Sequence, residues 1–167
     1  MKNLPIASTR STTRTKTAGA FRAVVAVALM VGSLASQAAD GLVSGKSTRS
    51  AKETMDRFEA AAKQRGLNVF VRVDHAAGAA SVGKTLRPTE VLIFGNPRGG
   101  TPLLECAQTV GIDLPLKALV WEDAAGQVWL GYNDTTYVAK RHEAPDCPAA
   151  ANVGKVLADI SAQALGQ

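Results

Sequence analysis

The sequence is poor in the residues that most often carry chemistry. Its 167 residues include two histidines and two cysteines, and only 5% of them are aromatic. It contains no Cys-x-x-Cys pair, no Gly-x-Ser-x-Gly motif and no Cys or His spacing typical of a zinc site. These absences argue against a dithiol redox centre, a serine hydrolase and a zinc finger. The sequence alone assigns no catalytic residue.

Acidic residues are missing from the start of the chain, where none occurs before Asp40 although five basic residues do. An apolar run of thirteen residues, 23–35, is too short to span a bilayer core of about 30 Å comfortably. Ser36 and Ala38 then occupy the −3 and −1 positions of a cleavage site. This order predicts a signal peptide over residues 1–38, cut after Ala38, and a periplasmic or secreted protein without stable membrane insertion. An uncleaved anchor and an organelle transit peptide stay open as alternatives.

An excess of charge of either sign is absent from the rest of the chain. Five of the 19 Lys and Arg residues precede residue 39, so residues 39–167 carry 14 basic and 14 acidic residues. A neutral domain lacks the broad positive field that a phosphate backbone requires, and we expect no nucleic-acid partner. These 129 residues suit a single domain with one core.

Hydrophobic periodicity and capping residues predict the element order β-α-β-α-β-α-β-β-α-α. Strict alternation places Val69, Val71 and Val73 on one buried side of a strand. Thr101 is expected to cap a helix that has Pro102 at its first position. The expected strands are 42–44, 67–74, 91–94, 118–122 and 127–132. The expected helices run from the Ser50–Glu53 capping box to Gly66 and over 75–83, 101–108, 135–141 and 148–164.

One stretch, residues 88–133, has a distinctive order: PTEVLIFGNPRGGTPLLECAQTVGIDLPLKALVWEDAAGQVWLGYN. It resembles the domain of unknown function 302 family, whose members carry similar LRPTxLLIFGNPxxGTPLM and LDLPLKxLVWED segments. The resemblance implies an α+β domain with a curved, mainly antiparallel sheet of about five strands and helices packed on one face. This fold is similar to that of the TATA-binding protein. The resemblance also implies a homodimer, and it attaches no established reaction to the chain.

The Gly-rich turn 95–101 is the best candidate for a binding site. Its backbone N–H groups, the dipole of the following helix and Arg98 favour an anion such as a carboxylate, sulfate or phosphate. No Gly-Lys-Ser/Thr follows this turn, so it is not a Walker loop. The alternative is a tight strand-to-helix turn that binds nothing.

The aromatic residues of the C-terminal hairpin are a second candidate. They are expected either to pack across the strands or to form a dimer contact or a pocket wall. The candidate ligand-binding residues are Asn96, Arg98, Gly99, Gly100, Thr101, Tyr132 and Asn133.

Cysteine and histidine residues supply the competing hypotheses. Cys106 and Cys147 can form a disulfide in an oxidising compartment, remain free thiols or link to a partner chain. His75 and His142 are weak candidates for a metal or haem site, and His75, Glu105 or Cys106 would serve a redox protein or an enzyme. A scaffold subunit of an envelope assembly is a third hypothesis. We favour an exported homodimer that binds a small ligand without a required cofactor.

Overall fold

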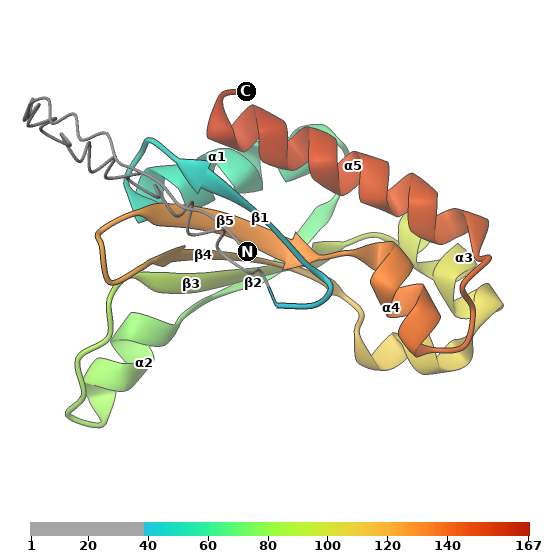
Figure 1. Cartoon of the computed structure of the whole chain (residues 1–167), viewed down its shortest axis with the longest axis horizontal. Coiled ribbons are helices and arrows are strands. Elements are labelled where there is room, and N and C mark those ends of the chain that lie inside the picture. The colour runs from blue at the N-terminus through green and yellow to red at the C-terminus, as the bar shows by residue number, and fades with distance from the viewer. Residues whose placement is uncertain (1–38) are drawn as a thin grey trace, which may run out of the picture. The chain divides into compact units, whose positions relative to one another are not determined.

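An open five-stranded sheet in the order β1-β5-β4-β3-β2 organises the domain, and every neighbouring pair in it is antiparallel (Figure 1). The computed structural model describes residues 39–167, so the export signal predicted for residues 1–38 lies outside the described residues. The α+β class expected from the sequence is confirmed. The strands are β1 (Leu42–Ser47), β2 (Asn68–Asp74), β3 (Thr89–Gly95), β4 (Leu116–Glu122) and β5 (Val128–Asn133).

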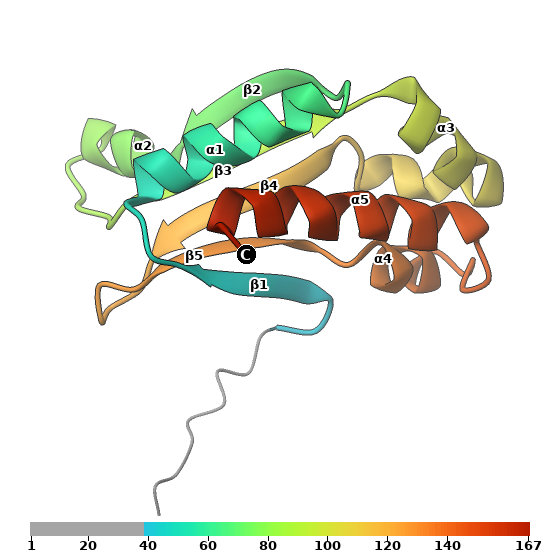
Figure 2. The ribbon, with the colours of Figure 1, turned by 90° about the horizontal axis from the view of Figure 1, so that it is seen from above.

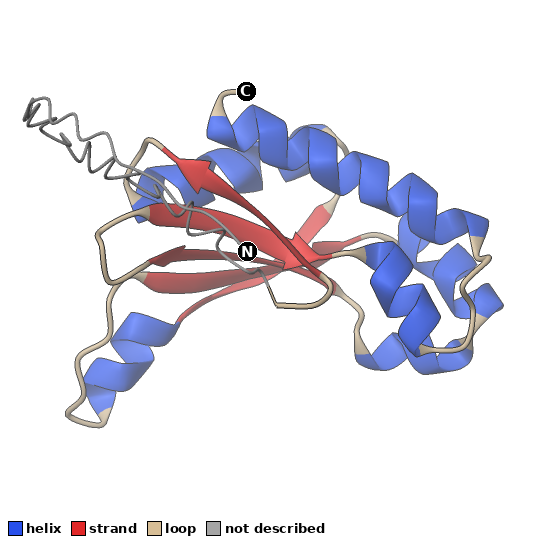
Figure 3. Cartoon of the chain, in the orientation of Figure 1, coloured by secondary structure: helices blue, strands red, loops and turns tan. Residues whose placement is uncertain are grey.

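Two long helices cover one face of this sheet, and shorter ones gather at its end (Figures 2 and 3). The long helices, α1 (Ala51–Gln64) and α5 (Pro148–Leu165), pack against each other. In Figure 1, α2 (His75–Ser81) extends from the opposite side of the sheet, at the connection between β2 and β3. The end of the sheet carries α3 (Pro97–Cys106), the 3₁₀ helix η1 (Gln108–Ile112) and α4 (Thr135–Arg141).

The main core lies between the sheet and the two long helices. The predicted capping box starts α1, because the Ser50 hydroxyl accepts a hydrogen bond from the Glu53 N–H at 3.2 Å. Phe58 of α1 and Phe94 of β3 are fully buried and meet edge to face, with ring centroids 5.3 Å apart. Leu130 and Ile160 complete this layer from β5 and α5.

The alternation expected for β2 is wrong beyond Val69. The pairing with β3 shifts between Val69 and Val71, which leaves Phe70 as the extra residue of a β-bulge. A slip of one residue exchanges the two faces of a strand. Val71 and Val73 are therefore 44% and 36% exposed, and Arg72 turns toward α1.

Candidate functional site

A cavity of about 690 Å³ lies where α3, segment 111–116 and the first half of α5 meet. Most of its wall is aliphatic, as at Leu104, Leu114 and Val153. Phe70 and Leu67 add to it from the start of β2. Cavities of this size and character hold small organic molecules. The polar lining residues are Arg65, Asn96, Arg98, Thr101 and Asn152.

The helix after β3 begins at Pro97, and the prediction that Thr101 caps it is wrong. Asn96 is the cap residue, and its side chain accepts a hydrogen bond from the Gly99 N–H at 3.0 Å. Asparagine is a preferred helix cap, and proline is tolerated at the first helical position. Pro102 consequently lies inside α3. The Gly-rich segment is the first turn of a helix rather than a loop.

This geometry removes most of the backbone donors that the anion hypothesis requires. The Gly99 N–H donates to Asn96 Oδ1 and the Gly100 N–H donates to the Asn96 carbonyl, each at 3.0 Å. Pro97 has no N–H to offer. Any anion at this cavity therefore depends mainly on side-chain charge.

Arg98 supplies that charge, since it is exposed and lines the cavity. It is the one arginine within residues 39–167 that makes no hydrogen bond or ion pair inside that range. Arg65 also lines the cavity, but its guanidinium lies 3.3 Å from the Asp159 carboxylate. The Arg98 guanidinium is the group best placed to pair with an anionic ligand.

The structure brings together five of the seven predicted ligand residues, namely the five from the Gly-rich segment. Tyr132 is 8% exposed and packs in the main core, where burial and the charge of Asp134 raise the pKa of its hydroxyl. Asn133 is exposed at the end of β5 and does not line the cavity. Trp121 and Trp129 stack with centroids 6.2 Å apart on strands β4 and β5. Tyr132 and Asn133 therefore do not share this cavity with the Gly-rich segment.

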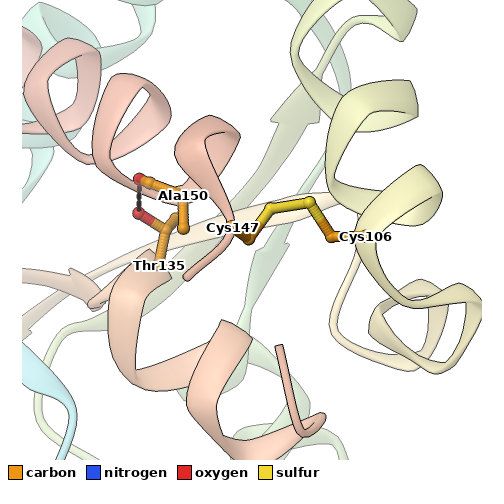
Figure 4. The surroundings of a disulfide bond; sticks show 4 residues. All are labelled: Cys106, Thr135, Cys147 and Ala150. Atoms are coloured by element: carbon orange, nitrogen blue, oxygen red, sulfur yellow. Dashed lines mark hydrogen bonds between the residues drawn. A yellow bond between two sulfur atoms is a disulfide. The ribbon is translucent and has the colours of Figure 1, made fainter. Parts of the chain in front are cut away.

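Cys106 and Cys147 are joined by a disulfide bond (Figure 4). Cys106 ends α3, and Cys147 is the cap residue of α5. The bond therefore ties together two walls of the cavity. Beside it, the Thr135 hydroxyl donates to the Ala150 carbonyl at 2.6 Å and holds α4 to α5. With both sulfurs bonded, neither serves as a thiolate nucleophile.

The two histidines lie in different surroundings. His142 Nε2 lies 2.7 Å from an Asp113 carboxylate oxygen, and its Nδ1 lies 3.0 Å from the Thr109 hydroxyl. It thus links the end of α4 to the η1 region. His75 is exposed at the first residue of α2. Among residues 39–167, no group of three or more His, Cys, Asp or Glu side chains is arranged to hold a metal ion.

Comparison with known sequences places the domain in a protein family. A family model described as "Domain of unknown function DUF302" matches residues 43–164, which run from β1 into α5. The chain belongs to the DUF302 family. The match confirms the resemblance seen in residues 88–133 and extends it over nearly all of the described domain.

A solved structure of an uncharacterized conserved DUF302 protein from Bacillus stearothermophilus has the same architecture. It superposes with a TM-score of 0.69 and covers 75% of this chain and 99% of its own. The sequence identity is 23%, so this likeness concerns the fold alone.

Curated relatives of this DUF302 chain carry the name of a transport protein. They include the fluoride-specific ion channels FluC 1 of Brucella suis and FluC 2 of Brucella melitensis, each 53% identical over 102 residues. The match spans 61% of this chain, and 40% and 38% of the two relatives. Most of each named channel therefore lies outside the match. No helix within residues 39–167 combines the length and apolar character needed to cross a bilayer.

The sequence did not reveal most of the cavity wall. Val153 and Val156 of α5 pack against the main core and also line the cavity. A helix of 18 residues is about 27 Å long, whereas a six-residue strand covers about 20 Å. Figure 2 shows the N-terminal half of α5 reaching past the strands toward α3. This mismatch in length is the signal that could have located the cavity.

Proposed function

We propose that this DUF302 protein binds a small amphipathic ligand in the cavity between α3 and α5. The observation that carries this proposal is a cavity of about 690 Å³ with mainly aliphatic walls and few polar groups. Burial of an apolar body supplies affinity, and the few polar groups supply orientation. The Arg98 guanidinium favours a ligand with a carboxylate or similar anionic end.

The lining residues support binding rather than catalysis. Arg65 and Arg98 are the titratable side chains among them. The guanidinium group of arginine carries N–H donors and no acceptor, so neither side chain offers the acceptor atom of a general base. General acid–base catalysis requires a group whose pKa lies near the working pH.

The Arg98→Gln variant is expected to bind sodium dodecanoate about tenfold more weakly than the wild type, because the carboxylate loses its partner, a change of about 1.4 kcal/mol. Isothermal titration calorimetry measures the affinities. Lys84→Gln is the charge-matched control, since Lys84 is exposed and lies outside the cavity. Equal affinity of the Arg98 variant and the wild type would remove the ion pair from the proposal. No binding by the wild type would overturn the proposed function for fatty anions.

We also infer that the domain works outside the cytoplasm. Disulfide bonds form and persist in oxidising compartments, and the Cys106–Cys147 bond supports that location. The signal peptide predicted over residues 1–38, with residues 39–167 as the mature single domain, agrees with it and stays a prediction.

The homodimer expected from the family has a candidate surface on the sheet face opposite α1 and α5. Val73, Val91 and Leu119 face each other across three strands there, and Val73 is 36% exposed. We expect sedimentation equilibrium to show a dimer for the wild type. The Val73→Lys variant should be a monomer, because dimerisation would bury the charge of the lysine in the interface. Ile112→Lys, on η1 and also exposed, should leave the mass unchanged. A monomeric wild type would contradict this proposal.

The role as an envelope scaffold stays a prediction, favoured by relatives in which a similar segment belongs to a longer channel protein.

A further inference from the structure

We propose that Gly99 and Gly100 determine which ligands enter the cavity, because they leave the α3 backbone bare where the apolar body of an amphipathic anion packs. This inference rests on the proposed function and names the contact that selects the ligand. The anionic end of such a ligand pairs with Arg98, and its apolar body lies on the first turn of α3.

The fold itself requires neither glycine. Both have ordinary helical backbone conformations rather than a positive φ. A Cβ at Gly99 would lie 3.7 Å from Asn96 Oδ1, and one at Gly100 would lie 3.8 Å from Leu114 Cδ1, which are normal van der Waals contacts. By contrast, a Cβ at Gly45 would lie 2.6 Å from Leu165 Cδ1 and could not be accommodated without movement.

The two glycines also lower the stability of α3. Glycine inside a helix is less favourable than alanine, because it loses more backbone entropy on folding. Two adjacent glycines in the first turn therefore disfavour the helix, although the space around each of them would accept a Cβ. A residue choice that opposes local stability is typical of a functional site.

Side chains at these two positions would point toward the cavity wall. The atoms nearest to a Cβ added at either glycine belong to Asn96, Val153 and Leu114, and all three residues line the cavity. Larger residues in place of the glycines would therefore enter the space between α3 and its neighbours. Bare backbone at this wall permits an apolar ligand to approach closely.

A second local irregularity converges on the same cavity. The β-bulge leaves Phe70 57% exposed, and Phe70 is a lining residue. Bulges next to binding sites re-aim a side chain. The bulge also exposes Val71 and Val73, so β2 gives up apolar burial while Phe70 faces the cavity. An aromatic ring adds apolar contact area for the body of the ligand.

The Gly100→Ala variant is expected to be more stable but to bind more weakly. Removing a helix glycine should raise Tm by about 2–4 °C, and the added methyl group should weaken sodium dodecanoate binding about tenfold. Gly78→Ala is the matched control, since Gly78 is also the fourth residue of its helix and a Cβ there meets nothing within 4 Å. It should raise Tm without changing the affinity. Differential scanning calorimetry and isothermal titration calorimetry measure the two effects.

Each other outcome identifies what has failed. Unchanged dodecanoate affinity in Gly100→Ala, with the wild type binding, would overturn the glycine contact and leave the proposed function standing. A lower Tm in Gly100→Ala would show that the fold needs the glycine and would overturn the inference. If the wild type binds no dodecanoate, the proposed function for fatty anions and the inference both fall.

Discussion

The double variant Cys106→Ala, Cys147→Ala is expected to have a free energy of unfolding about 4 kcal/mol lower than that of the wild type. The disulfide joins residues 41 positions apart, and opening a loop of that length restores about this much chain entropy to the unfolded state. Urea unfolding followed by circular dichroism measures the difference. The free energy of unfolding of a whole domain is typically about 5–15 kcal/mol, so a loss of about 4 kcal/mol is a large fraction of it.

The loss should appear throughout the domain, because the disulfide acts on the entropy of the unfolded state. Amides of β3 and β4 in the centre of the sheet exchange through global unfolding, so their hydrogen exchange should accelerate by the full loss of stability. Cys106 ends α3 and Cys147 precedes α5, so α3 and the first turns of α5 should in addition exchange faster through local opening. The wild type treated with a reductant is the control and should match the double variant.

Two results would contradict the prediction that the disulfide stabilises the fold. One is a destabilisation of less than about 1 kcal/mol in the double variant, which would mean that the bond contributes little to folding. The other is a titration of two free thiols in denatured, unreduced protein isolated from the cell envelope. The second result would also remove the support for a location outside the cytoplasm.

The sequence predicted those elements that depend on local chemistry. The capping box at Ser50 starts α1 as expected, and Gly126 occupies the left-handed position of the β4–β5 turn with φ 79°. The order of strands and helices also agrees with the structure. Caps and turns are decided by a few neighbouring residues, which is why periodicity and turn chemistry located them.

The start of α3 could not be predicted, because the segment contains the same signal twice. Asn96-Pro97 and Thr101-Pro102 each offer a capping side chain followed by proline, and the intervening glycines favour the second site. The structure uses the first site, which buries Leu103 against Val110 and Ala150 and accepts Pro102 inside the helix. Packing between distant segments overrode the local preference.

The direction in which the β2 side chains point could not be predicted for a related reason. Valine at every second position predicts a regular strand, but the pairing with β3 introduces the bulge at Phe70. Downstream of it, Arg72 occupies the face that packs on α1. The carboxylates that α1 and β3 present to Arg72 favour this orientation, and they lie 16 and 18 positions away in the sequence.

The Arg72→Met variant is expected to lower the free energy of unfolding by about 2–3 kcal/mol at pH 7. The Arg72 guanidinium donates to both oxygens of Glu90 at 2.6 and 2.7 Å, to Asp56 at 2.7 Å and to Glu59 at 3.2 Å. These hydrogen bonds, above all the pair to Glu90, raise the pKa of Arg72. Its removal leaves three carboxylates crowded between β2 and α1 without their shared cation. Arg65→Met, which breaks the exposed pair with Asp159, is the control and should lose at most about 1 kcal/mol.

The deficit of the Arg72 variant should shrink as the pH falls. Lys52 and then Arg72 lower the pKa of Asp56, and Lys63 and then Arg72 lower the pKa of Glu59. A carboxyl group with a lowered pKa stabilises the fold above its unfolded pKa, and that contribution is lost as the pH falls through the folded value. In the wild type this stabilisation is therefore complete above about pH 5 and declines below about pH 4. Urea unfolding of both proteins at pH 7 and pH 3 should show their stabilities converging at the lower pH. A difference that stays constant with pH would contradict the prediction, because the loss would then not depend on the charge of the carboxylates.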